Sequence, residues 1–206
     1  MKRNKEAMRQ RIVKESITLF LRKGFQGTAM EEITDAVNLT KGAIYWYFKS
    51  KDELLEAILQ EWEKAYLDGL IASVNGVEGT FLDRFRQYHK YAWGYAGNHP
   101  ELCMVWTILV AEIAGSGLRA ESKFREGLDR YIEFVKGLVD SGKAELVIKE
   151  DLDSYVLANS IIGMQNGLFL QWYLKQNDLM GPQLARAFSG VLLSGITVKG
   201  DSLQGH

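Results

Sequence analysis

One stretch near the N-terminus, residues 28–55, constrains the fold more strongly than any other part of the chain. Thr28 and Glu31 have the Thr-x-x-Glu spacing of a capping box, which predicts the start of a helix. Asn38 tolerates a left-handed backbone and can end that helix, and Thr40 can then cap a second one. Two helices joined by a turn of about three or four residues have the spacing of a helix-turn-helix.

The second helix, expected from Lys41 to about Phe48, has an unusual outward face. Ile44 and Phe48 share one side at helical spacing and should be buried. The opposite side and its flanks combine two very small residues with three aromatic rings, namely Gly42, Ala43, Tyr45, Trp46 and Tyr47. Small residues allow close approach to base edges, while hydroxyl groups and the N–H groups at a helix N-terminus can bind phosphate oxygens. We therefore predict that this face binds DNA, with further contacts from Thr28, Thr40, Lys41 and Lys51. An ordinary helical hairpin with exposed aromatic residues is the alternative.

The distribution of charge points to the same part of the chain. Residues 1–51 carry 11 Lys and Arg against 5 Asp and Glu, a net charge of +6, whereas the remainder carries 14 against 21, a net charge of −7. A basic N-terminal quarter on an acidic body is expected of a protein that binds a polyanion. Lys5, Arg9 and Arg11 lie in this basic segment and could reach phosphate groups beside the motif.

The run from Arg11 to Leu55 resembles the DNA-binding domain of the TetR family of transcriptional regulators. The segment TKGAIYWYFKSKDELL is similar to the signature around that family's recognition helix, and it is most similar to the AcrR-like branch of multidrug regulators. Thr34 and Asn38 depart from the family pattern, which usually has Ala and Gly there, but both fit the local geometry. The residues that match the pattern are Ile12, Leu19, Phe20, Gly24, Thr28, Ile33, Gly42, Tyr45, Phe48, Lys51 and Leu54.

The resemblance implies a regulator with two domains. Residues 1–50 would form a three-helix helix-turn-helix domain, and residues 51–206 would form a larger helical domain for ligand binding and dimerisation. Such a regulator binds a palindromic DNA operator as a homodimer, most often as a repressor, and leaves it when a small ligand binds. The resemblance also implies that the helix starting at Ser50 transmits the ligand signal.

Composition and pattern predict an all-α protein. The chain has only two prolines, many strong helix formers and no alternating strand pattern. No segment reaches the roughly 18–20 apolar residues of a membrane span, and the charged N-terminus lacks the apolar core of a secretory signal. The single cysteine, Cys103, lies among apolar residues and is expected in the core of a protein in a reducing cytoplasm.

Periodicity and helix-capping signals predict the remaining elements. Ser50 and Glu53 repeat the capping-box spacing and start a helix that can run to about Val74 as one stiff rod. A loop with a short apolar anchor, Leu146 to Ile148, is expected at residues 142–153. The other helices are expected at residues 5–23, 80–97, 100–114, 118–141, 152–174 and 182–198.

The middle of the chain, from Trp62 to Phe134, is unusually rich in aromatic residues. Rings offer a large contact area and Met adapts in shape, so these residues suit a pocket for a flat, apolar ligand. The predicted ligand-binding residues are Trp62, Tyr66, Phe85, His89, Trp93, Met104, Trp106 and Phe134. An aromatic stripe at helical spacing is also compatible with an ordinary core. The histidines do not have metal-ligand spacing, so neither a metal nor a cofactor is predicted for His89, His99 and His206.

The last two helices are predicted to form a dimer interface. The segment Leu152–Leu174 is apolar on nearly all sides, and such a helix must be buried on all sides. One side can pack on its own domain, and the other requires a partner, as in a two-fold four-helix bundle. The predicted interface residues are Ile161, Gln165, Leu168, Trp172, Phe188 and Leu192. A monomer that buries both helices in its own core is the alternative.

These features favour a ligand-responsive transcriptional regulator, most often a repressor, that a small apolar or aromatic effector releases from its operator. One alternative is an all-α enzyme, but the sequence has no Gly-rich phosphate loop, no Ser/His/Asp set and no His-Glu-x-x-His motif. The other alternative is a helical ligand-binding protein that does not bind DNA.

Overall fold

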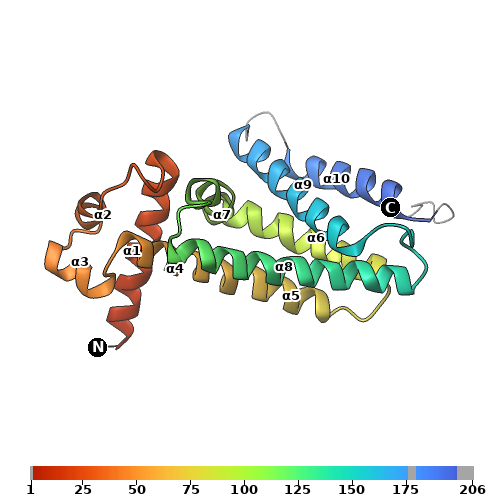
Figure 1. Cartoon of the computed structure of the whole chain (residues 1–206), viewed down its shortest axis with the longest axis horizontal. Helices are drawn as coiled ribbons and strands as arrows, with labels where there is room; N and C mark the ends of the chain where they lie inside the picture. Colours follow the sequence, from red (N-terminus) through yellow and green to blue (C-terminus); the bar gives the residue numbers. More distant parts are fainter. Residues whose placement is uncertain (1, 176–179, 199–206) are drawn as a thin grey trace. The chain divides into compact units, whose positions relative to one another are not determined.

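The computed structural model describes residues 2–175 and 180–198 of the 206-residue chain. This described part is helical and contains an isolated β-bridge between Ile148 and Thr197 but no strand, which confirms the all-α prediction. The helices, labelled in Figure 1, are α1 (Lys2–Lys23), α2 (Met30–Ala36), α3 (Lys41–Tyr47), α4 (Lys51–Trp62), a π-helical turn (Glu63–Leu67), α5 (Asp68–Asn75), α6 (Phe81–Asn98), α7 (Pro100–Ile113), α8 (Arg119–Ala144), α9 (Ser154–Leu174) and α10 (Gly181–Ile196).

The chain folds into two compact units, and each unit combines two separate segments. The first unit comprises the chain up to Ala65 together with His99–Gly127, and it contains α1 to α4, α7 and the start of α8. The second unit comprises Tyr66–Asn98 and the chain from Leu128 onward, and it contains α5, α6, most of α8, α9 and α10. The boundary predicted at residue 50 separates functions rather than packing units, and it stays a prediction.

In the first unit, α1 begins before the predicted Lys5 and ends, as predicted, at Lys23, directly before Gly24. Gly24 has a φ of +77°, the left-handed conformation that commonly follows a helix. Phe25 then folds back, and its ring centre lies 5.4 Å from that of Phe20. Glu112 of α7 accepts a hydrogen bond from the Phe25 N–H at 2.7 Å, which holds the chain in place as it leaves α1.

The start of α2 corrects one predicted cap. Ala29, not Thr28, is the N-cap residue, and its backbone N–H donates at 3.0 Å to the carboxylate of Glu32 rather than that of Glu31. Thr28 is buried instead, and its hydroxyl donates to the carbonyl oxygen of Gly24 at 2.8 Å. The predicted capping box therefore lies one residue too early in the chain.

The other predicted helix ends are found where the sequence indicates them. Asn38 follows α2 with a φ of +55°, and Thr40 caps α3 with its side-chain oxygen. Ser50 caps α4 by accepting the N–H of Glu53 at 3.0 Å. The reciprocal half of that box differs, because the Glu53 carboxylate accepts the N–H of Lys49 and not that of Ser50.

The connection that follows Ser50 is helical throughout, but it is not the regular α-helix that we expected. α4 ends at Trp62, residues 63–67 form a π-helical turn, and α5 continues to Asn75. The first unit ends and the second begins within this turn, between Ala65 and Tyr66. The prediction of a single uninterrupted rod is therefore corrected.

In the second unit, α8 runs to Ala144 and is longer than predicted. Of the predicted apolar anchor in the following loop, Ile148 is buried and Leu146 is exposed. Asp153 caps α9 by accepting a backbone N–H, so α9 begins slightly later than predicted. The bounds of α6, α7 and α10 agree with the predicted ranges to within two residues.

Two kinds of feature are absent from the described ranges. No helix there is both long enough and apolar enough to cross a lipid bilayer. No group of three His, Cys, Asp or Glu side chains there comes together in a way that could hold a metal ion. His206 lies outside the described residues. Cys103 is buried, as predicted, and burial raises the pKa of its thiol to about 12.

Replacing Gly24 with Ala should destabilise the protein by more than its backbone conformation accounts for. A left-handed φ costs a non-glycine residue roughly 1–2 kcal/mol. In addition, a Cβ at Gly24 would lie 2.7 Å from a carboxylate oxygen of Glu112, which would have to move and give up its hydrogen bond to Phe25. We expect a total loss of about 2–3 kcal/mol in the free energy of unfolding, measured by urea denaturation.

Gly115→Ala is the matched control for this prediction. Its φ is +78°, and no described atom beyond its two chain neighbours lies within 4 Å of a Cβ built there, so it should lose only the conformational part. Equal losses in the two variants would contradict the proposed role of Glu112.

Candidate functional site

α3 turns its small and aromatic residues away from the core, as its sequence predicts. Ile44 and Phe48 are 0% and 1% exposed, whereas Trp46 is 57% exposed. Apart from the neighbouring backbone of α3 itself, no described atom lies within 4 Å of a Cβ built on Gly42, so the backbone is open at that point. The partly buried flanks of this face are Ala43, Tyr45 and Tyr47. The helix therefore presents a surface that another molecule can approach closely.

Cations from α1 lie beside α3, Lys5 at its outward face and Arg9 at the buried Phe48. The ammonium group of Lys5 lies 4.1 Å from the ring centre of Trp46, and the guanidinium group of Arg9 lies 5.0 Å from that of Phe48. Arg11 is exposed on the same helix. The basic N-terminal segment therefore contributes positive charge next to α3, which is where a phosphate backbone would be expected.

Lys41, at the start of α3, is exposed but paired. Its ammonium group lies 2.8 Å from the carboxylate of Glu31 on α2. The hydrogen bond between them lowers the pKa of Glu31 and raises the pKa of Lys41. Exposed pairs contribute little to stability, so a phosphate oxygen could replace the carboxylate as the partner of Lys41.

Two predicted DNA contacts are corrected by their surroundings. Thr28 is buried and its hydroxyl bonds within the chain, so its side chain is not available to a phosphate group. The ammonium group of Lys51 donates to the carbonyl oxygens of Phe25, Gln26 and Thr28, the last at 2.8 Å. An ammonium group has three donors, so all of them are engaged. Burial lowers the pKa of Lys51. Lys51 therefore fastens the turn between α1 and α2 to the start of α4.

The predicted ligand-binding residues are divided between the two units. Trp62, Met104 and Trp106 belong to the first unit and are buried there. The rings of Trp62 and Trp106 stack with their centres 3.5 Å apart, and Phe124 packs on Trp106 at 4.3 Å. These three predicted residues are therefore part of a core that joins α4, α7 and α8. The second unit holds the remaining ones, Tyr66, Phe85, His89, Trp93 and Phe134.

A buried hydrogen-bonded group in the second unit, here called the tyrosine cluster, consists of Tyr66, Tyr88, Tyr131 and Gln165. The hydroxyl oxygen of Tyr131 lies 3.1 Å from that of Tyr66 and 2.8 Å from that of Tyr88. The side-chain amide of Gln165 donates to Tyr66 at 3.2 Å and to Tyr131 at 3.1 Å. Burial raises the pKa of Tyr88. The members come from four different elements, so no local spacing in the sequence could have revealed Tyr88 and Tyr131 as partners.

Several buried polar atoms near this cluster have no hydrogen-bond partner among the described residues. They are Nδ1 and Nε2 of His89, Nε1 of Trp93 and Oε1 of Gln165. The imidazole ring of His89 is surrounded by other rings, with the ring centres of Phe85 at 4.9 Å and Phe188 at 5.0 Å. Burial lowers the pKa of His89 to about 4, so the imidazole is neutral at pH 7.

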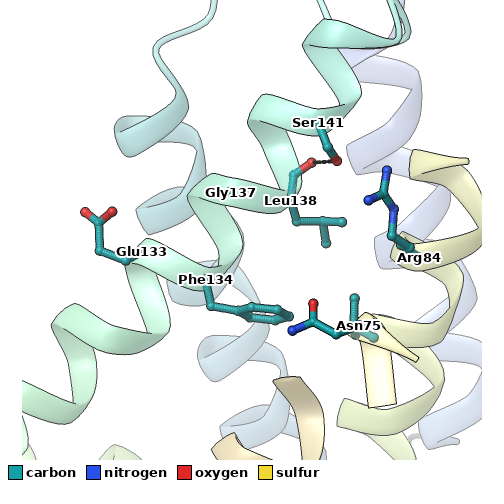
Figure 2. A pocket seen from close by; sticks show the side chains of 8 residues that line it. Asn75, Arg84, Glu133, Phe134, Gly137, Leu138 and Ser141 are labelled. Atoms are coloured by element: carbon teal, nitrogen blue, oxygen red, sulfur yellow. Dashed lines mark hydrogen bonds between the residues drawn. The ribbon is translucent and has the colours of Figure 1, made fainter. Parts of the chain in front are cut away.

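A separate cavity of about 230 Å³ lies in the second unit, between α5, α6 and α8 (Figure 2). The ring of Phe134 points toward Asn75, and Leu138 points toward Arg84. Arg84 forms an ion pair of 2.6 Å with Glu145, and its buried Nε has no partner in the described part of the chain. This cavity differs from the tyrosine cluster in that it contains charged groups. Its lining residues are Val74, Asn75, Arg84, Glu133, Phe134, Gly137, Leu138 and Ser141.

Three of the six predicted dimer residues, Ile161, Gln165 and Leu192, are corrected by their burial. Ile161, Gln165, Phe188 and Leu192 are all buried. Gln165 bonds to the tyrosine cluster, and the ring of Phe188 contacts His89. Ile161, Gln165 and Leu192 therefore pack inside their own unit, whereas Phe188 also lines the groove between α9 and α10.

The outer side of α9 and α10 is nevertheless apolar. Leu168 and Trp172, the other predicted interface residues, are partly exposed. Met164 is exposed, and Val191 is 73% exposed. A groove of about 460 Å³ runs between the two helices and is lined by Met164, Gly167, Leu168, Gln171, Leu184, Ala187, Phe188 and Val191.

Comparison with known proteins gives the same description of the N-terminal helices. Residues 12–58 match the family model described as "Bacterial regulatory proteins, tetR family". The chain is similar to the biofilm operon icaADBC HTH-type negative transcriptional regulator IcaR of Staphylococcus aureus (strain Newman), with 39% identity over 170 residues that cover 82% of this chain and 83% of the relative.

Solved structures agree over nearly the whole chain. The crystal structure of the MbdR regulator from Azoarcus sp. CIB superimposes with a TM-score of 0.82 at 25% identity, covering 93% of this chain and 100% of that one. The structure of AibR in complex with isovaleryl coenzyme A and operator DNA has a TM-score of 0.78 at 20% identity, covering 90% and 98% of the two chains. The similarity to AibR is one of fold alone.

Lys51→Met should lower stability rather than act first on DNA binding. The variant keeps the aliphatic chain but leaves the carbonyl oxygens of Phe25, Gln26 and Thr28 without their shared donor. We expect a loss of about 1–3 kcal/mol in the free energy of unfolding, measured by urea denaturation. Lys49→Met is the matched control, because Lys49 is exposed and donates to a single carbonyl, and it should lose less than about 0.5 kcal/mol. If Lys51→Met instead leaves stability unchanged and weakens DNA binding, the predicted contact of Lys51 with phosphate is correct.

Proposed function

Because the chain belongs to the TetR family of bacterial regulatory proteins, we propose that it is a ligand-responsive repressor that binds a palindromic operator as a homodimer. As a member of that family it is a transcriptional regulator and not an enzyme. The observation that carries the proposal is the outward face of α3, where the open Gly42 and the exposed Trp46 lie opposite the buried Ile44. Residues 1–50 are the proposed DNA-binding domain, and residues 51–206 are the proposed domain for ligand binding and dimerisation.

The reading of bases is assigned to the outward face of α3. Gly42 and Ala43 have no bulky side chain, so the helix can enter the major groove closely, and the Ala methyl group can contact a thymine methyl group. Trp46 lies about one turn further along and offers the largest apolar contact on this face. Cations of α1 beside this face support binding to any sequence through phosphate. The residues proposed to contact phosphate oxygens are Thr40, Lys41, Tyr45 and Tyr47.

The dimer is assigned to the apolar groove between α9 and α10. Met164 and Val191 expose apolar surface on this side, and a contiguous apolar surface on a helix pair is typical of an interaction site. Two such helix pairs related by a two-fold axis would form a four-helix bundle. A dimer can place its two recognition helices in successive major grooves when they are about 34–36 Å apart. The operator is therefore proposed to be an approximate palindrome.

The effector is assigned to the aromatic interior of the second unit. Tyr66, Phe85 and His89 are buried there and Trp93 is partly buried, and their rings offer contact area for a small aromatic molecule. Binding of the effector is proposed to favour a state of the dimer with lower affinity for DNA. DNA must then lower the affinity for the effector by the same factor.

Trp46→Ala should change which sequences the full-length protein selects from a random pool of DNA duplexes. The reading face loses its largest side chain, so we expect discrimination at the affected base pairs to fall by about 1–3 kcal/mol each. Tyr45→Phe is the control, because it removes only a hydroxyl group and should weaken binding a few-fold at every sequence. If Trp46→Ala selects the same sequences as the parent, the bases are read by a different face.

Val191→Glu should convert the dimer into a monomer. The new carboxylate would be buried in an apolar groove without a cation, and such burial is strongly unfavourable. Light scattering after size-exclusion chromatography, at micromolar concentration, measures the molar mass. Leu146→Glu is the matched control, since Leu146 is an exposed apolar residue outside the groove, and this variant should remain dimeric. A dimer that survives Val191→Glu has its interface elsewhere.

A further inference from the structure

Three side chains in the second unit, His89, Trp93 and Gln165, hold buried polar atoms that no other described residue satisfies. Proteins pair the great majority of their buried polar atoms, because an unpaired one keeps the full cost of losing its hydration. A single unpaired atom can be an isolated defect of packing. Four such atoms on three side chains could all be satisfied by one bound molecule that is not part of the chain.

These side chains lie in one aromatic layer. His89 and Trp93 are about one turn apart on α6 and therefore share a face of that helix. The ring of Trp93 meets Phe169 of α9 edge-on at 4.8 Å, and Phe169 is about one turn beyond Gln165 on the same helix. The ring of His89 meets Phe188 of α10 at 5.0 Å. The three side chains thus come from α6 and α9, and Phe188 of α10 packs against one of them.

We propose that this layer binds an uncharged, flat ligand that carries both a hydrogen-bond acceptor and a hydrogen-bond donor, such as a phenol or an aromatic amide. The inference rests on the proposed function, because it specifies the chemistry of the effector. The sequence predicts a small apolar or aromatic effector, and this inference adds polar groups to that ligand. A purely apolar ligand would leave all of these polar atoms unpaired.

The unpaired atoms define which groups the ligand must carry. The indole nitrogen of Trp93 can only donate, so it requires an acceptor on the ligand. Oε1 of Gln165 can only accept, so it requires a donor. A neutral imidazole has one nitrogen of each kind, so His89 can serve either group. The required ligand therefore combines both kinds of polar group on one small molecule.

The orientation of Gln165 is already fixed. Its amide nitrogen donates to the hydroxyl groups of both Tyr66 and Tyr131, and this holds Oε1 in one direction. A polar group that is held in place before binding loses little conformational freedom when the ligand arrives. The tyrosine cluster thus positions the acceptor, and it does so from three separate elements, namely the π turn, α8 and α9.

The surroundings favour a ligand without charge. The residues whose contacts define the layer are neutral, because burial lowers the pKa of His89 to about 4 and the others have no ionised group near pH 7. A carboxylate or an ammonium group placed there would lose its hydration without gaining an opposite charge. The cavity in Figure 2 is different, because the charged side chain of Arg84 lines it.

A matched set of probes on one ring system tests the inference. Naphthalene, 2-naphthol and 2-naphthoate differ in the polar group but share the ring. Binding of each to the full-length protein is measured by isothermal titration calorimetry at pH 7.5. We expect 2-naphthol to bind at least about tenfold more tightly than either of the others, as one additional buried hydrogen bond allows. Equal or tighter binding of naphthalene or 2-naphthoate, or no binding by any of the three, would overturn the proposal.

Two variants test whether the named atoms cause this preference. Trp93→Phe removes the indole donor and keeps a ring against Phe169, and Gln165→Leu removes the acceptor at nearly constant volume. Each should reduce the preference for 2-naphthol over naphthalene by about tenfold. Gln60→Leu makes the same change at an exposed position and should leave the preference intact. A preference that survives in Trp93→Phe contradicts the assignment even if Gln165→Leu does not fold.

Selection of DNA by the same preparation separates this inference from the proposed function. If the protein selects a palindrome but prefers naphthalene or 2-naphthoate, the proposed repressor function stands and the proposed class of effector is wrong. If the protein prefers 2-naphthol but selects no DNA, the proposed ligand site stands and the proposed repressor function is wrong. The two results are measured independently, so each proposal can fail alone.

Discussion

The burial of Ile44 and Phe48 is the constraint on which the DNA-facing surface depends. α3 has only 7 residues, and a helix of this length is not stable in isolation, so packing must determine both its existence and its orientation. With these two side chains in the core, Gly42 and Trp46 are directed outward by helical geometry alone. Lys51 supports the same arrangement, because its ammonium group holds the turn between α1 and α2 against the start of α4.

The order of the helices and the outward face of α3 could be predicted because both depend on residues that are close together in the sequence. The cap of α2 could not, since Ala29 has no side-chain oxygen that would mark it as an N-cap, whereas Thr28 has one but is buried. The structural role of Lys51 could not be predicted either, because its carbonyl partners lie 23 to 26 residues earlier in the chain.

The aromatic residues show where composition stops being informative. An abundance of rings predicted an aromatic interior, but it did not indicate that Trp62 and Trp106 would stack in one unit while His89 and Trp93 lie in the other. The second difficulty is α9, which is apolar on nearly all sides and therefore gives no signal of which side faces inward. Gln165 was predicted on the outside, whereas two tyrosine hydroxyl groups hold it on the inside.

The π-helical turn at residues 63–67 makes the length of the connecting segment matter more than its composition. A π turn needs more residues than an α turn to complete a revolution, so over these residues the helix face lags behind a regular α-helix by about a quarter of a turn. Tyr66 lies within this turn and meets Tyr131 from there. Removing one residue would restore a regular path and rotate that hydroxyl group away, so this segment should accept substitutions more readily than a change of register.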